Sequence, residues 1–375
     1  MVPGPTACDA CLRRTLLVDL LAPYIERIAM DRRGRSAPEL LSLGDEKLAR
    51  AAGGEKGLAF LRRASATPAR ELRRLLTDSG VWACCRHHHA YPPRLRDSRE
   101  APALLTGVGD HGRLGALAGE PVATVVGSRR ASSYGRGAAR ELGQLLAASE
   151  VIVVSGMALG IDAKAHRGAL DGAGLTVAVL GGGPETSYPP RQARLHGEIC
   201  EAGLVLSEAL PGASSWRWRF PARNRIMAAL GGVTVVVEAA AHSGSLITAG
   251  MAADLGRTVG AVPGPINSWL SAGTNNLLAD GALVVRGAED VLDALLGPGR
   301  RAPNTGAALE PGLRAVLERV ERGERTPDAV ATDGGAGAAE AAAALARLEL
   351  MGYVRSDASG RYERTLLSEP EASRP

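Results

Sequence analysis

Short apolar runs alternate with helical stretches through the middle of the chain. The runs are rich in Val and Leu and cover residues 122–126, 151–154, 175–180, 204–206, 233–237, 258–262 and 282–285. Helical patterns fill nearly all the gaps; in 134–148, Leu142, Leu145 and Leu146 share one face. Strands that alternate with helices over this length indicate a parallel sheet covered on both faces. Residues 121–297 are therefore predicted to be an α/β domain.

The segments before this domain lack the alternation. Residues 1–75 carry leucine clusters at helical spacing, punctuated by glycines, and predict a small helical domain. Residues 76–120 contain the turn-forming Tyr91-Pro92-Pro93 and Ala101-Pro102, and we interpret them as a connector.

The segments after the domain predict a small separate module. Residues 298–307 are rich in Pro, Gly and Arg and form a predicted linker. In residues 308–366, two helical patterns precede a hairpin around Ser359-Gly360, which is typical of a winged helix; 367–375 is a tail. The second helix, 338–350, is mostly Ala and Leu with only Arg347 basic. Because major-groove readers present Arg, Lys, Asn or Gln, we interpret this module as accessory or protein-binding.

The loops after the predicted strands carry small and polar residues, which converge on the carboxyl edge of a parallel sheet. The most suggestive is the loop 127–135, where Gly127, Ser128 and Arg129 follow a strand and precede a helix. This geometry points backbone N–H groups and a helix N-terminus at an anion. The loop has neither Gly-x-Gly-x-x-Gly nor Gly-x-x-x-x-Gly-Lys-Ser/Thr, so we expect no dinucleotide cofactor and no NTPase.

A second candidate site combines aromatic and cationic side chains at the start of a predicted helix. Phe220-Pro221-Ala222-Arg223-Asn224-Arg225 follows Trp216-Arg217-Trp218-Arg219. Guanidinium groups bind phosphates and exposed rings stack on unpaired bases, so this composition favours single-stranded nucleic acid, with the Trp pair as stacking platforms. The alternative is that Pro221 only begins a helix, the arginines are solvated and the tryptophans belong to a core.

Charge and hydropathy narrow these possibilities. Residues 121–297 contain 14 basic and 14 acidic side chains, so the cations there are local clusters. A neutral domain with two arginine clusters suggests a focused pocket. The chain has no apolar run of 18 residues and no apolar signal core after its first charges, which predicts a cytoplasmic protein without a membrane partner.

The central motifs resemble, in order and in number, those of the DprA/Smf family, the DNA-processing proteins of bacterial natural transformation. The matching segments are Val126-Gly127-Ser128-Arg129, 155–162, Ala165-His166, 178–181, Tyr188-Pro189, Ser207-Glu208, 220–225, Glu238-Ala239, 243–249, 261–264 and 275–282. Tyr91-Pro92 and Ala101-Pro102 extend the match upstream, and the C-terminal segment is similar to the family's winged-helix domain, notably at 348–352. The N-terminal match is loose.

The resemblance implies an extended Rossmann-like fold and a competence protein without catalysis. It implies a homodimer that binds single-stranded DNA, protects incoming DNA and helps to load the RecA recombinase during natural transformation and recombination. The DNA pocket it implies contains Gly127, Ser128, Arg129, Arg217, Phe220, Arg223, Asn224, Arg225, Ser243 and Gly244. It implies no cofactor.

Other residues carry two interpretations each. Asp162 and His166 share a helical face and could serve acid–base chemistry, but packing is the favoured interpretation. Glu208 and Glu238 could be bases or ribose ligands, although fixing loops through N–H groups is favoured. Ser155, Ser243 and Ser245 have no His/Asp arrangement that would make them nucleophiles.

Two functions remain as alternatives to DNA binding. One is an enzyme of the nucleotide phosphoribohydrolase type on a related Rossmann-like fold, whose Pro-Gly-Gly-x-Gly-Thr-x-x-Glu motif is missing at 238–245. The other is a nucleotide-sensing protein on the same fold.

Cysteines and histidines gather in the N-terminal part of the chain. Cys8 and Cys11 form a Cys-x-x-Cys, and Cys84 and Cys85 precede His87, His88 and His89. Together they could make a zinc site. However, adjacent cysteines rarely both bind one metal and the spacing matches no standard finger, so we predict no metal.

Overall fold

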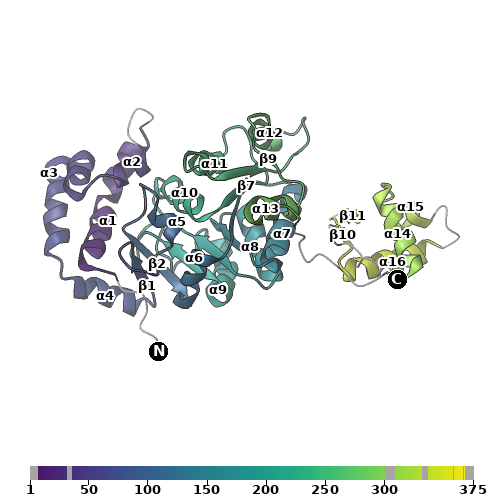
Figure 1. The fold of residues 1–375 in the computed structure, drawn as a ribbon, viewed down its shortest axis with the longest axis horizontal. Helices are drawn as coiled ribbons and strands as arrows, with labels where there is room; N and C mark the ends of the chain where they lie inside the picture. Colours follow the sequence, from purple (N-terminus) through teal and green to yellow (C-terminus); the bar gives the residue numbers. More distant parts are fainter. Residues whose placement is uncertain are drawn as a thin grey trace. The chain divides into compact units, whose positions relative to one another are not determined.

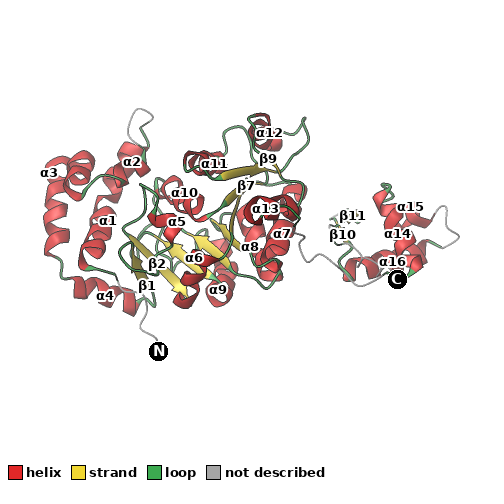
Figure 2. Cartoon of the chain, viewed as in Figure 1, coloured by secondary structure: helices red, strands yellow, loops and turns green. Residues whose placement is uncertain are grey.

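The computed structural model describes residues 7–31, 36–299, 309–331, 337–357, 359–365 and 367. The chain divides into two compact units, Met1–Ala302 and Pro303–Pro375, and each is described by itself. Figure 1 follows the chain from end to end, and Figure 2 separates helices from strands.

The first unit begins with a helical region, as predicted. Its helices are α1 (Asp9–Ala29), α2 (Ala37–Leu41), α3 (Asp45–Ala66) and α4 (Ala69–Asp78), drawn in purple to blue in Figure 1. Leu17, Leu21 and Ile25 of α1 pack with Leu40 and Leu48 in one apolar core. Periodic leucines therefore account for these helices, because a helix needs a buried stripe more than high propensity.

A mostly parallel sheet forms the centre of the unit, and each predicted apolar run forms one of its strands. The strands are β3 (Val122–Val126), β4 (Ile152–Ser155), β5 (Thr176–Val179), β6 (Leu204–Ser207), β7 (Val233–Val236), β8 (Thr258–Ala261) and β9 (Leu283–Val284). Most of them are buried on both faces, which explains why the sequence shows continuous apolar runs there.

The predicted connector also belongs to this sheet. Its strands β1 (Trp82–Cys85) and β2 (Leu104–Gly109) pair antiparallel and extend the sheet beyond β6. The Trp82 ring covers Gly107, and a Cβ at this position would lie 2.3 Å from that ring. The strand therefore needs a glycine here, and this glycine interrupts the apolar pattern in the sequence. The same segment holds α5 (Pro93–Arg96), α6 (Ala116–Gly119) and the 3-10 helix η1 (His111–Gly115).

Helices cover both faces of the sheet. One face is covered by α7 (Ser133–Ala148), α8 (Ile161–Asp171), α9 (Ala193–Ala202) and α13 (Ala288–Leu296). The other face is covered by α5, α10 (Arg219–Leu230) and α11 (Gly244–Asp254). The strand order is β1-β2-β6-β5-β4-β3-β7-β8-β9, so the winding direction reverses between β3 and β7. Ligands of doubly wound sheets bind at the carboxyl ends of the strands at such a point.

The second unit is a winged helix, as predicted. It contains α14 (Pro311–Glu321), α15 (Pro327–Ala331), α16 (Ala338–Leu350) and the hairpin of β10 (Val354–Ser356) with β11 (Tyr362–Arg364). Leu313, Leu317, Leu345 and Leu348 form its core. Most of the predicted linker and tail lies outside the described residues. Within the described ranges, no helix combines the length and the apolar character needed to span a membrane.

Candidate nucleic-acid interface

A cavity of about 830 Å³ opens at the point where the sheet reverses direction. The loop after β3 and the loop after β7 form two of its walls, and the first turns of α10 and α11 form the others. The 3-10 helix η3 (Trp269–Ser271) and the start of α12 (Ala272–Ala279) complete it. The cavity therefore lies where the fold alone predicts a ligand.

Glu238 ties the two loops together. The Ser128 amide donates to the Glu238 carbonyl over 2.7 Å, and the Ser132 amide and hydroxyl each donate to its carboxylate over 2.7 Å. The N-terminus of α7, which was predicted to face an external anion, is thus occupied by a carboxylate of the protein itself. The favoured interpretation of Glu238, fixing loop N–H groups, is confirmed.

Gly127 is required at the contact between these loops. A Cβ at this position would lie 2.6 Å from Ile161 Cγ1 and 2.8 Å from the Glu238 carbonyl oxygen. A larger residue would push the loop after β3 away from the sheet edge. The glycine therefore allows Ser128 and Arg129 to lie at the cavity.

Arg129 and Phe220 form the part of the cavity best suited to nucleic acid. The guanidinium carbon of Arg129 lies 5.5 Å from the Phe220 ring centre, and the Tyr188 ring lies 5.1 Å from the same ring. Arg129 is exposed, and Tyr188, next to η2 (Pro190–Gln192), is 42% exposed. We call these three residues the aromatic–arginine surface. It offers a fork of N–H donors beside ring faces.

Arg223 and Asn224 belong to the cavity wall. Arg223 donates from Nη1 to the Val179 carbonyl and from Nε to Asn224 Oδ1 over 3.1 Å, and its Nη2 lies 3.9 Å from an Asp162 carboxylate oxygen. Burial lowers the pKa of Arg223 to about 10, so the group stays charged at neutral pH. Burial also raises the pKa of Asp162, an effect that the Arg223 charge opposes. Arg223 therefore places a guanidinium in the wall, with two of its nitrogens in hydrogen bonds and the third beside the Asp162 carboxylate.

The first turn of α11 presents Ser243 and Gly244 to the cavity. The Ser243 hydroxyl caps the helix by accepting from the Ser245 amide over 3.4 Å, and the two hydroxyls lie 2.8 Å apart. The positive end of this helix dipole thus faces the cavity. Eight of the ten predicted site residues line the cavity: Gly127, Ser128, Arg129, Phe220, Arg223, Asn224, Ser243 and Gly244.

The sequence and structure of this chain match known proteins in the same region. Residues 82–296 match the family profile of DNA recombination-mediator protein A, and residues 300–360 match the DprA winged helix domain. The chain belongs to the DNA recombination-mediator protein A family.

Individual members of the family are also similar to this chain, both in sequence and in structure. The DNA processing protein DprA of Streptococcus pneumoniae is 42% identical over 202 residues, which are 54% of this chain and 70% of that protein. An X-ray structure of DprA from that organism superposes with a TM-score of 0.60 at 33% identity and covers 76% of this chain and 95% of its own.

A structure of DNA processing protein A from Helicobacter pylori, described for its single-stranded DNA binding mode, is also similar. It superposes with a TM-score of 0.50 at 29% identity and covers 55% of this chain and 92% of its own.

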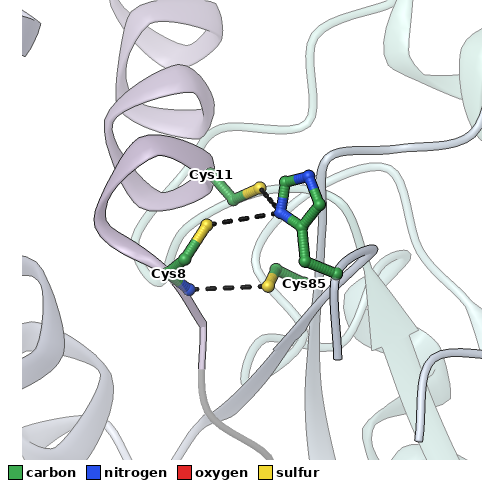
Figure 3. Close-up of side chains that lie close together, drawn as sticks. Cys8, Cys11 and Cys85 are labelled. Carbon is green, nitrogen blue, oxygen red and sulfur yellow. Dashed lines mark hydrogen bonds between the residues drawn. The ribbon is translucent and has the colours of Figure 1, made fainter. Parts of the chain in front are cut away.

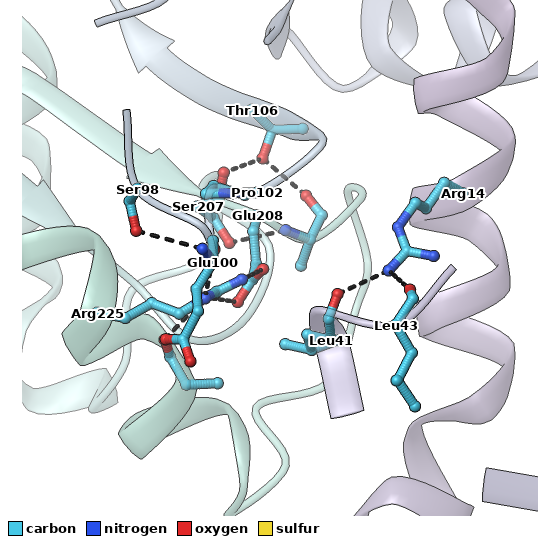
Figure 4. A network of polar contacts seen from close by, with 12 residues as sticks. Arg14, Leu41, Leu43, Ser98, Glu100, Pro102, Thr106, Ser207, Glu208 and Arg225 are labelled. Carbon is cyan, nitrogen blue, oxygen red and sulfur yellow. Dashed lines mark hydrogen bonds and ion pairs between the residues drawn. The ribbon is translucent and has the colours of Figure 1, made fainter. Parts of the chain in front are cut away.

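Arg225, which the family motif includes, points away from the cavity. It is 4% exposed and forms two hydrogen bonds to Glu208, of 2.8 and 2.6 Å, and one of 2.9 Å to the Glu100 carbonyl (Figure 4). Burial alone would raise the pKa of Glu208, but the Arg225 charge and hydrogen bonds hold it below its usual value. Residues 220, 223, 224 and 227 share one helical face, whereas 225 lies two residues from 223 on the opposite face. The prediction of Arg225 as a DNA ligand is wrong for this reason.

Arg217 is exposed, but the residues that line the cavity do not include it. It precedes α10, whose first turn holds Phe220. Arg217 therefore does not line the cavity, although it was predicted to belong to the DNA pocket.

The tryptophans next to it also have a different role. Trp218 is buried among Leu17, Leu21 and Ala22, and its indole N–H donates to the Ala22 carbonyl over 3.1 Å. Trp216 packs against the same cluster, and Arg219 forms an ion pair with Asp19. The segment anchors the helical region to the sheet domain. The prediction that Trp218 stacks on bases is therefore wrong and the core alternative is confirmed for it, whereas Trp216 is only partly buried against the same cluster.

Sequence reasoning missed other groups at the cavity. Trp269 lines it and is 67% exposed, and His242 and Arg130 line it as exposed side chains. Trp269 follows Pro263-Gly264, one of the loops predicted at the ligand edge, and a lone aromatic there was the available signal. Tyr188 was visible only as part of the motif Tyr188-Pro189.

The candidate acid–base pair is structural. His166 is buried, its Nδ1 lies 2.7 Å from the Thr176 hydroxyl, and burial lowers its pKa to about 3. The Ser155 hydroxyl donates to the Val125 carbonyl over 2.6 Å. The packing interpretation of Asp162 and His166 is confirmed. Among the described residues that line the cavity, no group of metal-ligating side chains is found.

Proposed function

We propose that this protein binds single-stranded DNA in the cavity at the β3–β7 edge. The observation that carries the proposal is the aromatic–arginine surface, with the Arg129 guanidinium carbon 5.5 Å and the Tyr188 ring 5.1 Å from the Phe220 ring centre. Ring faces that can be reached from solvent stack on unpaired bases, whereas the bases of a duplex are already stacked on one another. A forked cation beside the rings can bind the phosphate that follows the stacked base.

The charges around the cavity support a focused contact. Arg129 and Arg130 are exposed, Arg223 adds a buried positive charge, and the N-terminus of α11 adds a helix dipole. These groups are few, so binding should depend on salt only modestly compared with proteins that neutralise six to ten phosphates. The single-stranded DNA binding mode described for the H. pylori relative agrees with this proposal.

The wider role that we propose follows from the family. Bound DNA is protected as it enters during natural transformation, and the protein, as a homodimer in the cytoplasm, helps to load the RecA recombinase onto it. The proposed role is binding without catalysis. The described cavity residues support this, since Asp162 is held by Arg223 and His166 is buried elsewhere.

Fluorescence anisotropy with labelled oligo-dT and with a blunt duplex of equal length, at one salt concentration, tests the proposal. Stacking contributes about 1–3 kcal/mol per base, so the single strand should bind about tenfold tighter or more. Equal affinity for both would exclude base stacking as the basis of binding. Binding of neither would exclude the proposed function.

A further inference from the structure

Three thiols and one imidazole meet at one end of the helical region. The ligand atoms of Cys8, Cys11, Cys85 and His87 all lie within 4.8 Å of one another. The Sγ atoms of Cys8 and Cys11 lie 3.4 and 3.5 Å from the same His87 nitrogen, Nδ1 (Figure 3). None of these three cysteines forms a disulfide.

Two local structures bring these groups together. Cys8 directly precedes α1 and Cys11 lies in its first turn, so their spacing of three residues puts both on one face of the helix. Cys85 ends β1, and His87 follows in the turn after the strand. The Cys8 amide N–H points to Cys85 Sγ at 3.5 Å, which joins the two structures directly. Backbone N–H groups commonly support metal-bound sulfur in this way.

Strand geometry separates the adjacent cysteines. Successive side chains of a strand point to opposite faces, so only one of Cys84 and Cys85 can face α1. Cys85 packs with Cys11 and Leu12, whereas Cys84 packs with Tyr91 and Leu95 on the other side of the sheet. The objection that adjacent cysteines rarely share a metal therefore does not apply, because Cys84 takes no part in the cluster.

We propose that Cys8, Cys11, Cys85 and His87 bind one zinc ion at a structural site. Zn–S distances of about 2.3 Å and Zn–N distances of about 2.1 Å in a tetrahedron place a sulfur and a nitrogen ligand about 3.6 Å apart, and two sulfur ligands about 3.8 Å apart. The Cys8 and Cys11 Sγ atoms, at 3.4 and 3.5 Å from His87 Nδ1, lie close to the sulfur–nitrogen distance, and all four ligand atoms lie within 4.8 Å of one another. Four protein ligands close the coordination shell, which distinguishes a structural site from a catalytic one with an open position.

The site would fasten the start of α1 to the edge of the sheet. Cys8 and Cys85 are 77 residues apart in the chain, and the apolar cluster around them is small; its largest buried members are Leu12, Leu72, Leu76, Leu104 and Leu210. A metal that links two such segments contributes folding free energy that the cluster alone does not supply. The site lies on other residues than the cavity, so the proposal does not depend on DNA binding.

Metal content of the full chain, purified without chelator and measured by plasma mass spectrometry, tests the proposal with a matched pair of variants. His87 and His89 are both exposed, so replacing either by Ala should leave the fold intact. We expect about one zinc per chain in the wild type and in His89→Ala, and at least about fivefold less in His87→Ala. His87→Cys should retain zinc because four thiolates also form a structural site.

Two further measurements separate metal binding from general damage. Cobalt added to the metal-free wild type should give the intense visible absorption of a tetrahedral thiolate site, and His87→Ala should not. A chelator should lower the Tm of the wild type and leave that of His87→Ala unchanged. The proposal is overturned if the wild type holds less than about a fifth of an equivalent even after incubation with zinc, or if His87→Ala and His89→Ala hold equal amounts.

Discussion

Arg129 differs from the buried arginines of the site because its charge is exposed, and it differs from the exposed Arg130 because it lies over an aromatic ring. Arg219 and Arg225 are paired with Asp19 and Glu208, and Arg223 is buried in the wall, whereas Arg129 lies over the Phe220 ring. A cation that is held beside a ring and reaches solvent can exchange water for phosphate at little cost. We therefore propose Arg129 as the main phosphate contact.

Arg129→Ala should lower the affinity for single-stranded DNA by about 1.5–3 kcal/mol, the contribution of a charge-assisted hydrogen bond. Arg129→Lys should also lose affinity, since a point charge cannot reproduce the fork. Anisotropy titration measures both, and the Tm should barely move because an exposed loop cation adds little to folding. Arg74→Ala, at a residue 83% exposed on α4, is the control of equal charge. If both Ala variants weaken binding equally, the contact is diffuse electrostatics.

His166 should make folding sensitive to pH. Burial, followed by the nearby Arg223 charge, lowers the pKa of His166 to about 3, whereas an unfolded chain binds this proton below about 6.5. The unfolded state then holds more protons between these values, so the free energy of unfolding falls as pH drops from 6.5 toward 3. The slope from one group reaches about 1.4 kcal/mol per pH unit.

Urea denaturation at pH 7, 6 and 5 measures this dependence. His166→Gln should be less stable at pH 7, because the contact to Thr176 is disturbed, but its unfolding free energy should change less between pH 6.5 and 5. An identical slope in both proteins would show that other groups cause the pH dependence.

At the scale of single elements, α10 combines two functions on opposite faces. Phe220, Arg223 and Asn224 face the cavity, while Arg225 is buried against Glu208 and the Glu100 carbonyl (Figure 4). The sequence predicts the helix and its arginines but not which face each takes. That depends on where the sheet and the loop after β6 lie, and neither is set by local sequence.

Arg225→Ala should lower the free energy of unfolding by about 3–5 kcal/mol, because it leaves the Glu208 carboxylate buried without its partner. Arg225→Met combined with Glu208→Leu should recover much of this loss, since apolar residues of similar size can replace a buried ion pair. Chemical denaturation of the three proteins gives the comparison. A double variant less stable than Arg225→Ala would show that the two residues do not act as a pair.

The strands show which parts of the fold can be predicted from local sequence patterns. Residues 122–126 and 233–237 were predicted within a residue of β3 and β7, because both strands are buried on both faces and consist of apolar residues. Strands β1 and β2 were missed, since β1 reads Trp-Ala-Cys-Cys without the β-branched residues of the other strands, and Gly107 interrupts β2. The contact of Trp218 with α1 was missed as well, because it joins residues 196 positions apart.

At the scale of the whole molecule, the winged helix should contribute little to single-strand affinity. The exposed face of α16 consists mainly of Ala339, Ala343, Ala346 and Leu350, and Arg347 lies 3.4 Å from Glu310. Helices that read bases present polar side chains instead. This unit is compact by itself, which fits an accessory module.

A chain that ends at Gly299 should therefore bind oligo-dT within a few-fold of the full chain. The helices and strands of the first unit precede this position, since α13 ends at Leu296. Anisotropy and circular dichroism together separate binding from folding. A loss of more than about 2 kcal/mol, roughly 30-fold, in a folded protein would place the DNA contact in the second unit.

Photocrosslinking of the full chain to oligo-dT carrying 5-iodouracil, followed by peptide mass spectrometry, shows which side chains the bases of bound DNA contact. Halogenated uracil bonds to aromatic side chains on which it stacks. Stacking on the aromatic–arginine surface predicts adducts on Phe220 and Tyr188. In Phe220→Ala, the adduct at position 220 should disappear and the adduct on Tyr188 should become weaker, because the two rings contact each other. Adducts confined to Tyr362 of the winged helix, with none on residues at the cavity, would show that the bases do not stack on the aromatic–arginine surface.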